Sequence, residues 1–174
     1  MNVSTLYDKS IKLIDDSYDR LLKIWQLPKG SISKKNINHH AYYYHQYRDG
    51  KKVVSKLIRD DEIITLRKQI NERKRLIRLN KNAKEDVKKN VKVIAVFDKG
   101  LSASLLDEVY AYSFDEIPVH ERSKIALPLS QIDMKRFNPD GTMNKNLASY
   151  FEKWVHGEIR ARDIGNYIIQ KISD

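Results

Sequence analysis

The chain of 174 residues contains no cysteine, only six glycines and four prolines, and no long apolar run. The absence of cysteine excludes disulfides, thiolate zinc sites and a cysteine nucleophile. No stretch approaches the roughly 18 apolar residues that a spanning helix needs, and the N-terminus lacks the segments of a signal peptide. We therefore expect a cytoplasmic protein, without a membrane partner, that is stabilised by packing alone.

Positive charge is abundant and concentrated in one part of the chain. The formal net charge is +10, yet residues 29–92 carry +12, from nineteen Lys and Arg against seven acidic residues. Residues 1–28 are neutral and residues 93–174 carry −2. A block of this kind attracts polyanions, and no helix in it pairs a basic face with a wide apolar one, as membrane-surface helices do. We expect a nucleic-acid partner, DNA ahead of RNA.

The first half of the chain reads as a helix, a small sheet and a second helix. Apolar residues recur at helical spacing over 4–25, and Pro28 and Gly30 end that segment. Short β-branched and aromatic runs then predict strands over 31–37, 41–48 and 51–59, with a hairpin turn at Asp49-Gly50. Three acidic residues, 60–62, open a helix expected to reach about residue 86.

The second half reads as a mixture of helices and strands that follows a polar joint at 82–92. The continuous apolar run 91–97 predicts a buried strand. The further elements expected are a helix over 101–112, a strand near 125–132, and helices over 144–156 and 160–172. A packed helix pair explains the last two helices better than a helix-turn-helix does, because they carry few cations. The residues expected to pack are Leu147, Tyr150, Phe151, Trp154, Ile164, Tyr167 and Ile168.

These elements predict an α+β fold in three parts. An N-terminal amphipathic helix fills 1–28. A three-stranded antiparallel sheet with a long basic helix forms a nucleic-acid-binding module at 29–89. A mixed α/β half at 90–174, ending in two helices, is expected to regulate or to bind a protein or nucleoprotein partner, and the oligomeric state stays open.

Candidate contact residues follow from the basic module, because a sheet packed on a helix is one way to bring side chains to nucleic acid. The sheet tyrosines serve either as core or as stacking platforms for unpaired bases. The candidates on the sheet are Lys34, Lys35, Gln46, Arg48, Lys51, Lys52 and Lys56. Those on the helix are Arg67, Arg73, Lys74, Arg78 and Lys81.

The stretch from Pro28 to Arg59, with PKGSISKK and AYYYHQYRDGKKVVSK, resembles a segment of uncharacterised proteins from low-GC Gram-positive bacteria and their phages. More loosely, it resembles the three-stranded arm-binding domains of phage and transposon integrases. The resemblance implies DNA binding. It does not imply recombination, because the second half lacks the Arg, His-x-x-Arg and nucleophilic Tyr arrangement of tyrosine recombinases.

One pattern points to chemistry. Asp133 and Lys135 lie two residues apart and would share one face of a strand. Together with upstream acids such as Glu108 and Asp115, they form the pattern by which many nucleases hold Mg²⁺ and orient an attacking water. The histidines lack a metal-ligand spacing, so no metal or other cofactor is expected.

Three functions stay open at this point. The first is a non-catalytic, regulatory nucleic-acid-binding protein of a bacterium or mobile element. The second is a phage-encoded inhibitor, similar to anti-CRISPR proteins, that docks on a nucleoprotein defence complex. The third is a Mg²⁺-dependent nuclease.

Overall fold

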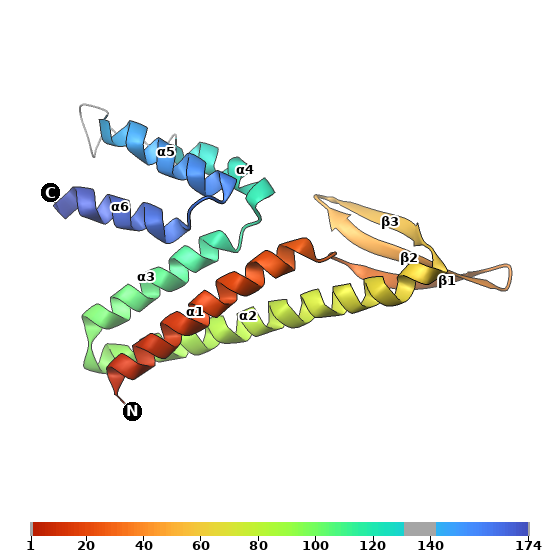
Figure 1. Ribbon diagram of the computed structural model, residues 1–174, viewed down its shortest axis with the longest axis horizontal. Coiled ribbons are helices and arrows are strands. Elements are labelled where there is room, and N and C mark those ends of the chain that lie inside the picture. Colours follow the sequence, from red (N-terminus) through yellow and green to blue (C-terminus); the bar gives the residue numbers. More distant parts are fainter. Residues whose placement is uncertain (1, 131–141, 174) are drawn as a thin grey trace. The chain divides into compact units, whose positions relative to one another are not determined.

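The structure, a computed structural model, describes residues 2–130 and 142–173 and consists of helices and one small sheet (Figure 1). Its elements are α1 (Val3–Gln26), β1 (Ser31–Ile37), β2 (His40–Asp49), β3 (Lys52–Ile58), a 3-10 turn (Asp60–Glu62), α2 (Ile63–Phe97), α3 (Lys99–Asp115), α4 (Val119–Ser130), α5 (Thr142–His156) and α6 (Ala161–Ser173). The expected α+β class is confirmed, with its N-terminal helix, antiparallel sheet and long helix. None of the described helices is both long and apolar enough to span a membrane.

The chain divides into two compact units. Residues 16–83 form the sheet unit, and residues 1–15 together with 84–174 form the helical unit. These units differ from the three parts expected from the sequence, because α1 and α2 each contribute residues to both.

The sheet has the order β1-β2-β3, and both of its connections are tight antiparallel turns. Ile37 pairs with His40, so the first turn consists of Asn38 and His39, whose φ angles are 49° and 65°. Both residues therefore adopt the left-handed conformation that a two-residue hairpin favours. The second turn holds Gly50, at a φ of 57°, and lies one residue later than expected, since Asp49 still pairs with Lys52.

Within the sheet unit, the second half of α1 packs on α2 through a buried polar contact. Ser17 and Asn80 are 2% and 4% exposed, and the side-chain amide of Asn80 donates to the Ser17 carbonyl oxygen at 3.1 Å. Arg20 Nε in turn donates to Asn80 Oδ1 at 2.5 Å. The amide group is therefore paired on both of its polar atoms, as buried polar groups need to be. Apolar residues buried in this unit include Tyr18, Leu21, Ile24, Ile58, Ile70 and Leu76.

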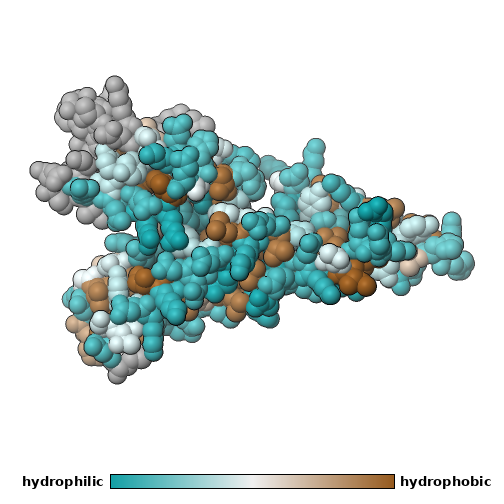
Figure 2. Space-filling model, viewed as in Figure 1, coloured by the Kyte–Doolittle hydropathy of each residue, from teal (hydrophilic) through white to brown (hydrophobic). Residues whose placement is uncertain are grey.

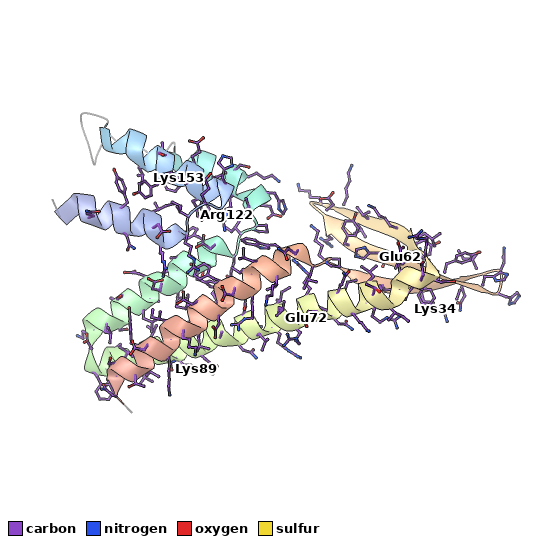
Figure 3. All side chains as sticks on the ribbon, in the orientation of Figure 1. Lys34, Glu62, Glu72, Lys89, Arg122 and Lys153 are labelled. Atoms are coloured by element: carbon purple, nitrogen blue, oxygen red, sulfur yellow. The ribbon has the colours of Figure 1, made fainter. Side chains whose placement is uncertain are left out.

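The strand expected over 91–97 is wrong, because α2 continues without a break to Phe97. The boundary expected within 82–92 contains the division between the two units, after Ala83, but the chain is helical there and not a loop. No glycine or proline interrupts α2. Its buried residues Ala83, Val87 and Ile94 follow helical spacing, and Val93 and Val96, which would be buried in a strand, are exposed. Ion pairs between residues three apart, Glu85–Lys88 and Asp86–Lys89, also stabilise the helix over this polar stretch. Lys89 is labelled in Figure 3.

The helical unit is organised around a buried ion pair. Asp115 and Arg122 lie 3.5 Å apart, and both side chains are 4% exposed. Arg122 also donates to the backbone oxygens of Ile117 and Trp154, at 3.0 and 2.8 Å, and its guanidinium lies 4.9 Å from the centre of the Trp154 ring (Figure 3). Trp154 Nε1 donates to Asp115 Oδ1 at 2.7 Å. One charged pair therefore joins the end of α3 to α4 and α5.

The C-terminal helices agree with the sequence prediction, and the intervening segment does not. α5 and α6 lie where two helices were expected, and Leu147, Trp154 and Ile164 form their common core. Residues 125–130, expected to begin a strand, belong to α4. The segment with Asp133 and Lys135 lies outside the described residues.

Replacing Arg122 with Ala should lower the free energy of unfolding of the helical unit by about 3 to 5 kcal/mol, because the change leaves the Asp115 carboxylate buried without its cation. Urea denaturation in a Trp25→Phe background, where Trp154 is the remaining tryptophan, measures this. Arg162→Ala is the control: it removes a half-exposed ion pair with Glu108 and should cost under about 1 kcal/mol. Equal losses would contradict the assigned role of the buried pair.

Gly30→Ala should destabilise the sheet unit more than Gly50→Ala does. A Cβ at Gly30, whose φ is 106°, would lie 2.1 Å from the Gln46 carbonyl oxygen, whereas one at Gly50 meets nothing within 4 Å. We expect a loss of roughly 3 kcal/mol or more at Gly30, against about 1 to 2 kcal/mol at Gly50, where only the positive φ is penalised. Thermal unfolding followed by circular dichroism compares the two, and a larger loss at Gly50 would refute the close approach.

Candidate nucleic-acid interface

The sheet unit carries a set of exposed cations that make no ion pair with any described carboxylate. Apart from Arg73, every Lys and Arg that the sequence singled out for nucleic-acid contact belongs to this set. The strands and turns from Ser31 to Ile58 hold six Lys and Arg and a single acid, Asp49. We call the ten members of this set that the sequence singled out the open cations: Lys34, Lys35, Arg48, Lys51, Lys52, Lys56, Arg67, Lys74, Arg78 and Lys81.

Most cations of α2 that follow the sheet unit have carboxylate partners. Lys84 Nζ lies 2.5 Å from Glu116, Lys88 lies 3.9 Å from Glu85, and Lys89 lies 3.2 Å from Asp86, and Lys92 is the exception among the described residues. Open cations therefore predominate on the helix up to Lys81, although Arg75 is paired with Glu72, and paired cations predominate from Lys84 on. Because exposed ion pairs contribute little to stability, this difference bears on the surface potential more than on folding.

The strand register divides the sheet's side chains between two faces, since paired residues and alternate residues point the same way. The Tyr43 face holds Ile32, Lys34, Asn36, Ala41, Tyr43, His45, Tyr47, Asp49, Lys52, Val54, Lys56 and Ile58. The Tyr42 face holds Ser31, Ser33, Lys35, Ile37, His40, Tyr42, Tyr44, Gln46, Arg48, Val53, Ser55 and Leu57.

The Tyr43 face is the more covered of the two. Ile58 is buried, and Tyr43, Tyr47 and Val54 are half-buried. His45 Nε2 lies 2.7 Å from the Lys29 carbonyl oxygen, which ties the middle strand to the residues that precede β1. This histidine therefore has a structural partner, and no group of three or more metal-binding side chains occurs in the described part of the chain.

The Tyr42 face combines open cations with rings. Lys35 Nζ lies 4.9 Å from the centre of the Tyr44 ring, within the range of a cation–π contact. Gln46 lies on this face, half-buried, and Arg48 lies at its end beside Val53. The predicted sheet residues are thus not gathered on one face, because Lys34, Lys52 and Lys56 point to the other.

Along α2, four open cations form one row. Arg67, Lys74, Arg78 and Lys81 are separated by seven, four and three residues, spacings that keep side chains on one side of a helix, and all four are exposed. Ile70, which is 3% exposed, lies beside the row and packs inward. The row expected from the sequence is therefore present as an exposed stripe.

A shallow hollow lies between the start of β1 and this row. It has a volume of about 210 Å³ and is lined by Ser31, Ile32, Arg67, Ile70, Asn71 and Lys74. Two open cations, one hydroxyl and one amide face a space large enough for a phosphate group with its solvent. These are the side chains that make sequence-independent contacts to a nucleic-acid backbone.

Arg73 is an exception among the predicted contact residues. Its Nη1 donates to the Leu27 carbonyl oxygen at 3.0 Å, so it satisfies a backbone acceptor just after the end of α1. Desolvation by this partial burial lowers the pKa of Arg73 from its ordinary value, although the guanidinium stays charged. Its role is structural, and spacing along α2 alone could not separate it from Lys74.

The acids proposed for a nuclease site are engaged elsewhere. Asp115 accepts hydrogen bonds from Trp154 Nε1 and from the backbone amide of Ala161, at 2.7 and 3.0 Å, in addition to pairing with Arg122. Glu108 lies 3.7 Å from Arg162. Both carboxylates therefore have structural partners, while Asp133 and Lys135 lie outside the described residues.

Sequence reasoning missed the apolar character of the Tyr42 face. Four of its side chains, Ile37, Tyr42, Val53 and Leu57, are exposed. Figure 2 shows brown residues scattered among teal ones on the face of the molecule in view. Alternation along a strand separates its two faces. It does not show which face is left uncovered, because both faces of this sheet carry tyrosines and lysines.

Arg73→Ala should lower the free energy of unfolding by about 1 to 2 kcal/mol, because it leaves the Leu27 carbonyl oxygen without its donor. Lys74→Ala, one residue along the same helix, should change it by less than about 0.5 kcal/mol, since that side chain is exposed. Urea denaturation of both variants tests the distinction. A neutral Arg73→Ala would return Arg73 to the set of free surface cations.

Comparison with known proteins finds a family match over part of this region. Residues 6–68 match a family described as "Domain of unknown function (DUF6788)". The matched segment covers most of α1, the whole sheet and the start of α2, and ends before Lys74. No curated protein matches the chain. No solved structure matches it either. The resemblance to integrase arm-binding domains stays a prediction.

Proposed function

We propose that this protein binds nucleic acid through the sheet unit and acts without catalysis, as a regulatory factor of a bacterium or mobile element. The observation that carries the proposal is the set of open cations: the sheet and the adjoining row on α2 present positive charge that no described carboxylate neutralises. DNA is the expected partner ahead of RNA.

Free cations favour a polyanion for a simple energetic reason. A lysine already held in an ion pair must give up its partner before it contacts a phosphate, and an open cation gives up only water. Each phosphate contact also releases condensed counterions from the nucleic acid, which drives binding and makes it dependent on salt. Ten open cations within residues 34–81 are enough to supply the several contacts that non-specific binding needs.

The hollow beside Arg67 and Lys74 supports the same proposal. Charge that served only solubility would not need to surround a hollow. Here the hollow is lined by two cations, Arg67 and Lys74, and by the polar residues Ser31 and Asn71. Backbone phosphate is the group that such a mixture of cations and neutral hydrogen-bonding groups recognises.

A charge-reversal variant tests the proposal. Replacing Arg67, Lys74 and Arg78 with Glu should weaken binding to a fluorescently labelled DNA by about 100-fold, because three phosphate contacts become repulsive. The plot of log affinity against log salt concentration should also become shallower by about 3. Fluorescence anisotropy at several salt concentrations, with single-stranded and duplex DNA, measures both quantities.

The same helix offers a matched control. Replacing Lys88, Lys89 and Lys92 with Glu makes the same change in charge, from +10 to +4, at exposed positions outside the sheet unit. The control should bind within a fewfold of the unaltered protein. If both triple variants lose affinity equally, net charge and not the open cations determines binding. Binding indifferent to salt, or no binding at all, would overturn the proposal.

A further inference from the structure

The Tyr42 face exposes large hydrophobic side chains, and phosphate binding alone does not explain why they are exposed. Ile37, Tyr42, Val53 and Leu57 are 46, 38, 64 and 62% exposed, and they are all of the large hydrophobic residues of the sheet that are exposed. All four lie on the Tyr42 face and none on the Tyr43 face. Large apolar side chains that are exposed together on one face of a sheet are typical of a binding surface.

The register places two of these residues, Tyr42 and Leu57, close to one another and to Tyr44, whereas Val53 pairs with Arg48 nearer the second turn. Tyr44 pairs with Leu57 on one side and with Ser33 on the other, and Tyr42, two residues away on the same strand, pairs with Lys35. Side chains paired across strands lie about 5 Å apart, and diagonal neighbours about 7 to 8 Å apart. Tyr42, Tyr44 and Leu57 thus form one continuous patch, with Lys35 at its margin over the Tyr44 ring.

We infer that the Tyr42 face binds the unpaired bases of a single-stranded nucleic acid, with Tyr42 as a stacking platform. The inference rests on the proposed function and names its substrate class. An unpaired base offers a flat apolar face and a charged phosphate a few ångströms away, which is the combination that Tyr42, Leu57 and Lys35 present. Aromatic side chains beside cations are the usual means of binding single strands without sequence preference.

A duplex fits this face less well. A sheet that enters the major groove meets hydrated base edges, which polar side chains read, and the thymine methyl is the main apolar group there. Placing Ile37, Val53 and Leu57 against those edges would strip water from donors and acceptors without replacing it. Stacking uses the faces of the bases, which are hidden in a duplex and exposed in a single strand.

The charge around the patch favours a nucleic acid over a protein as its occupant. Lys35 and Arg48 share the Tyr42 face, Lys51 occupies the turn beside it, and Asp49, the single acid from Ser31 to Ile58, points to the other face. A second copy of this chain would bring the same positive residues against them. Like charges of this density oppose self-association and favour a polyanion.

The test compares one sequence in three forms: single-stranded DNA, duplex DNA and single-stranded RNA, at one salt concentration, by fluorescence anisotropy. The altered protein is Tyr42→Thr with Leu57→Thr, which places residues of high strand propensity at both positions, keeps the charge and removes the apolar patch. Stacking on one tyrosine predicts a loss of about 5-fold to 150-fold in affinity for the single strands. Duplex affinity should stay within about twofold.

Two further variants separate stacking from general damage to the sheet. Tyr42→Phe keeps the ring and should bind single strands like the unaltered protein. Ala41→Thr makes a similar substitution at an exposed neighbouring position on the other face and should have no effect. A 2-aminopurine base within the strand reports stacking directly, so its fluorescence should change with Tyr42→Phe and not with the double Thr variant.

The outcomes distinguish this inference from the proposed function. Preference for single strands that the double Thr variant loses supports both, and the RNA arm then shows whether the sugar matters. Salt-sensitive binding that favours duplex, or that ignores the double variant, overturns the inference and leaves the proposed function standing. If the unaltered protein binds none of the three forms, both the inference and the proposed function are overturned. If the double variant instead abolishes self-association measured by sedimentation, the face is an interface between copies and the inference is overturned.

Discussion

The rest of the structure depends on α2 remaining one helix over its 35 residues. Its first part contributes Ile70, Leu76 and Asn80 to the sheet unit, and its last part contributes Val87 and Ile94 to the helical unit. A break in the polar stretch around residue 86 would remove the buried surface of both. That stretch stays helical because Ala83, Val87 and Ile94 bury one side and exposed ion pairs occupy another, so packing adds to the helix propensity of its alanine, lysines and glutamate.

The charge pattern along α2 follows the same division. Lys84, Lys88 and Lys89 have carboxylate partners. Of the cations from Arg67 to Lys81, only Arg75 has a carboxylate partner among the described residues, while Arg73 donates to the Leu27 carbonyl oxygen. Arg75 Nε and Nη2 both donate to the Glu72 carboxylate, and this pairing raises the pKa of the Arg75 guanidinium. Glu72 is therefore close to the row on α2 but pairs with Arg75 alone among the described residues. A helix evolving for stability alone would spread its acids evenly, since like charges three or four residues apart repel. The uneven spacing leaves a local positive potential that a polyanion relieves.

The sequence predicted the sheet unit well, because its signals are local. Pro28 and Gly30, the β-branched runs and the turn at Gly50 each determine backbone conformation within a few residues. Outside it, the apolar run 91–97 was read as a strand, since a buried strand and a short piece of buried helix look alike without their neighbours. The Asp115–Arg122–Trp154 network was missed for a related reason: its members are up to 39 residues apart and meet only when three helices pack. Likewise, nothing in the sequence separates Arg73, which donates to Leu27, from Lys74, which faces solvent.

Cations on strands have a second explanation, because lysines on edge strands also prevent sheets from pairing edge to edge. β1 and β3 are both edges, and Lys34, Lys35, Lys52 and Lys56 on them fit that role. It does not account for the row on α2, which protects no edge. It also conflicts with the Tyr42 face, because a sheet built only to avoid association would not leave Val53 and Leu57 more than 60% exposed. The sheet thus combines cations, which repel other positively charged proteins, with an apolar patch, which attracts an occupant. The two features are compatible when the occupant is an anion with flat apolar faces, and a strand of unpaired bases is such an anion.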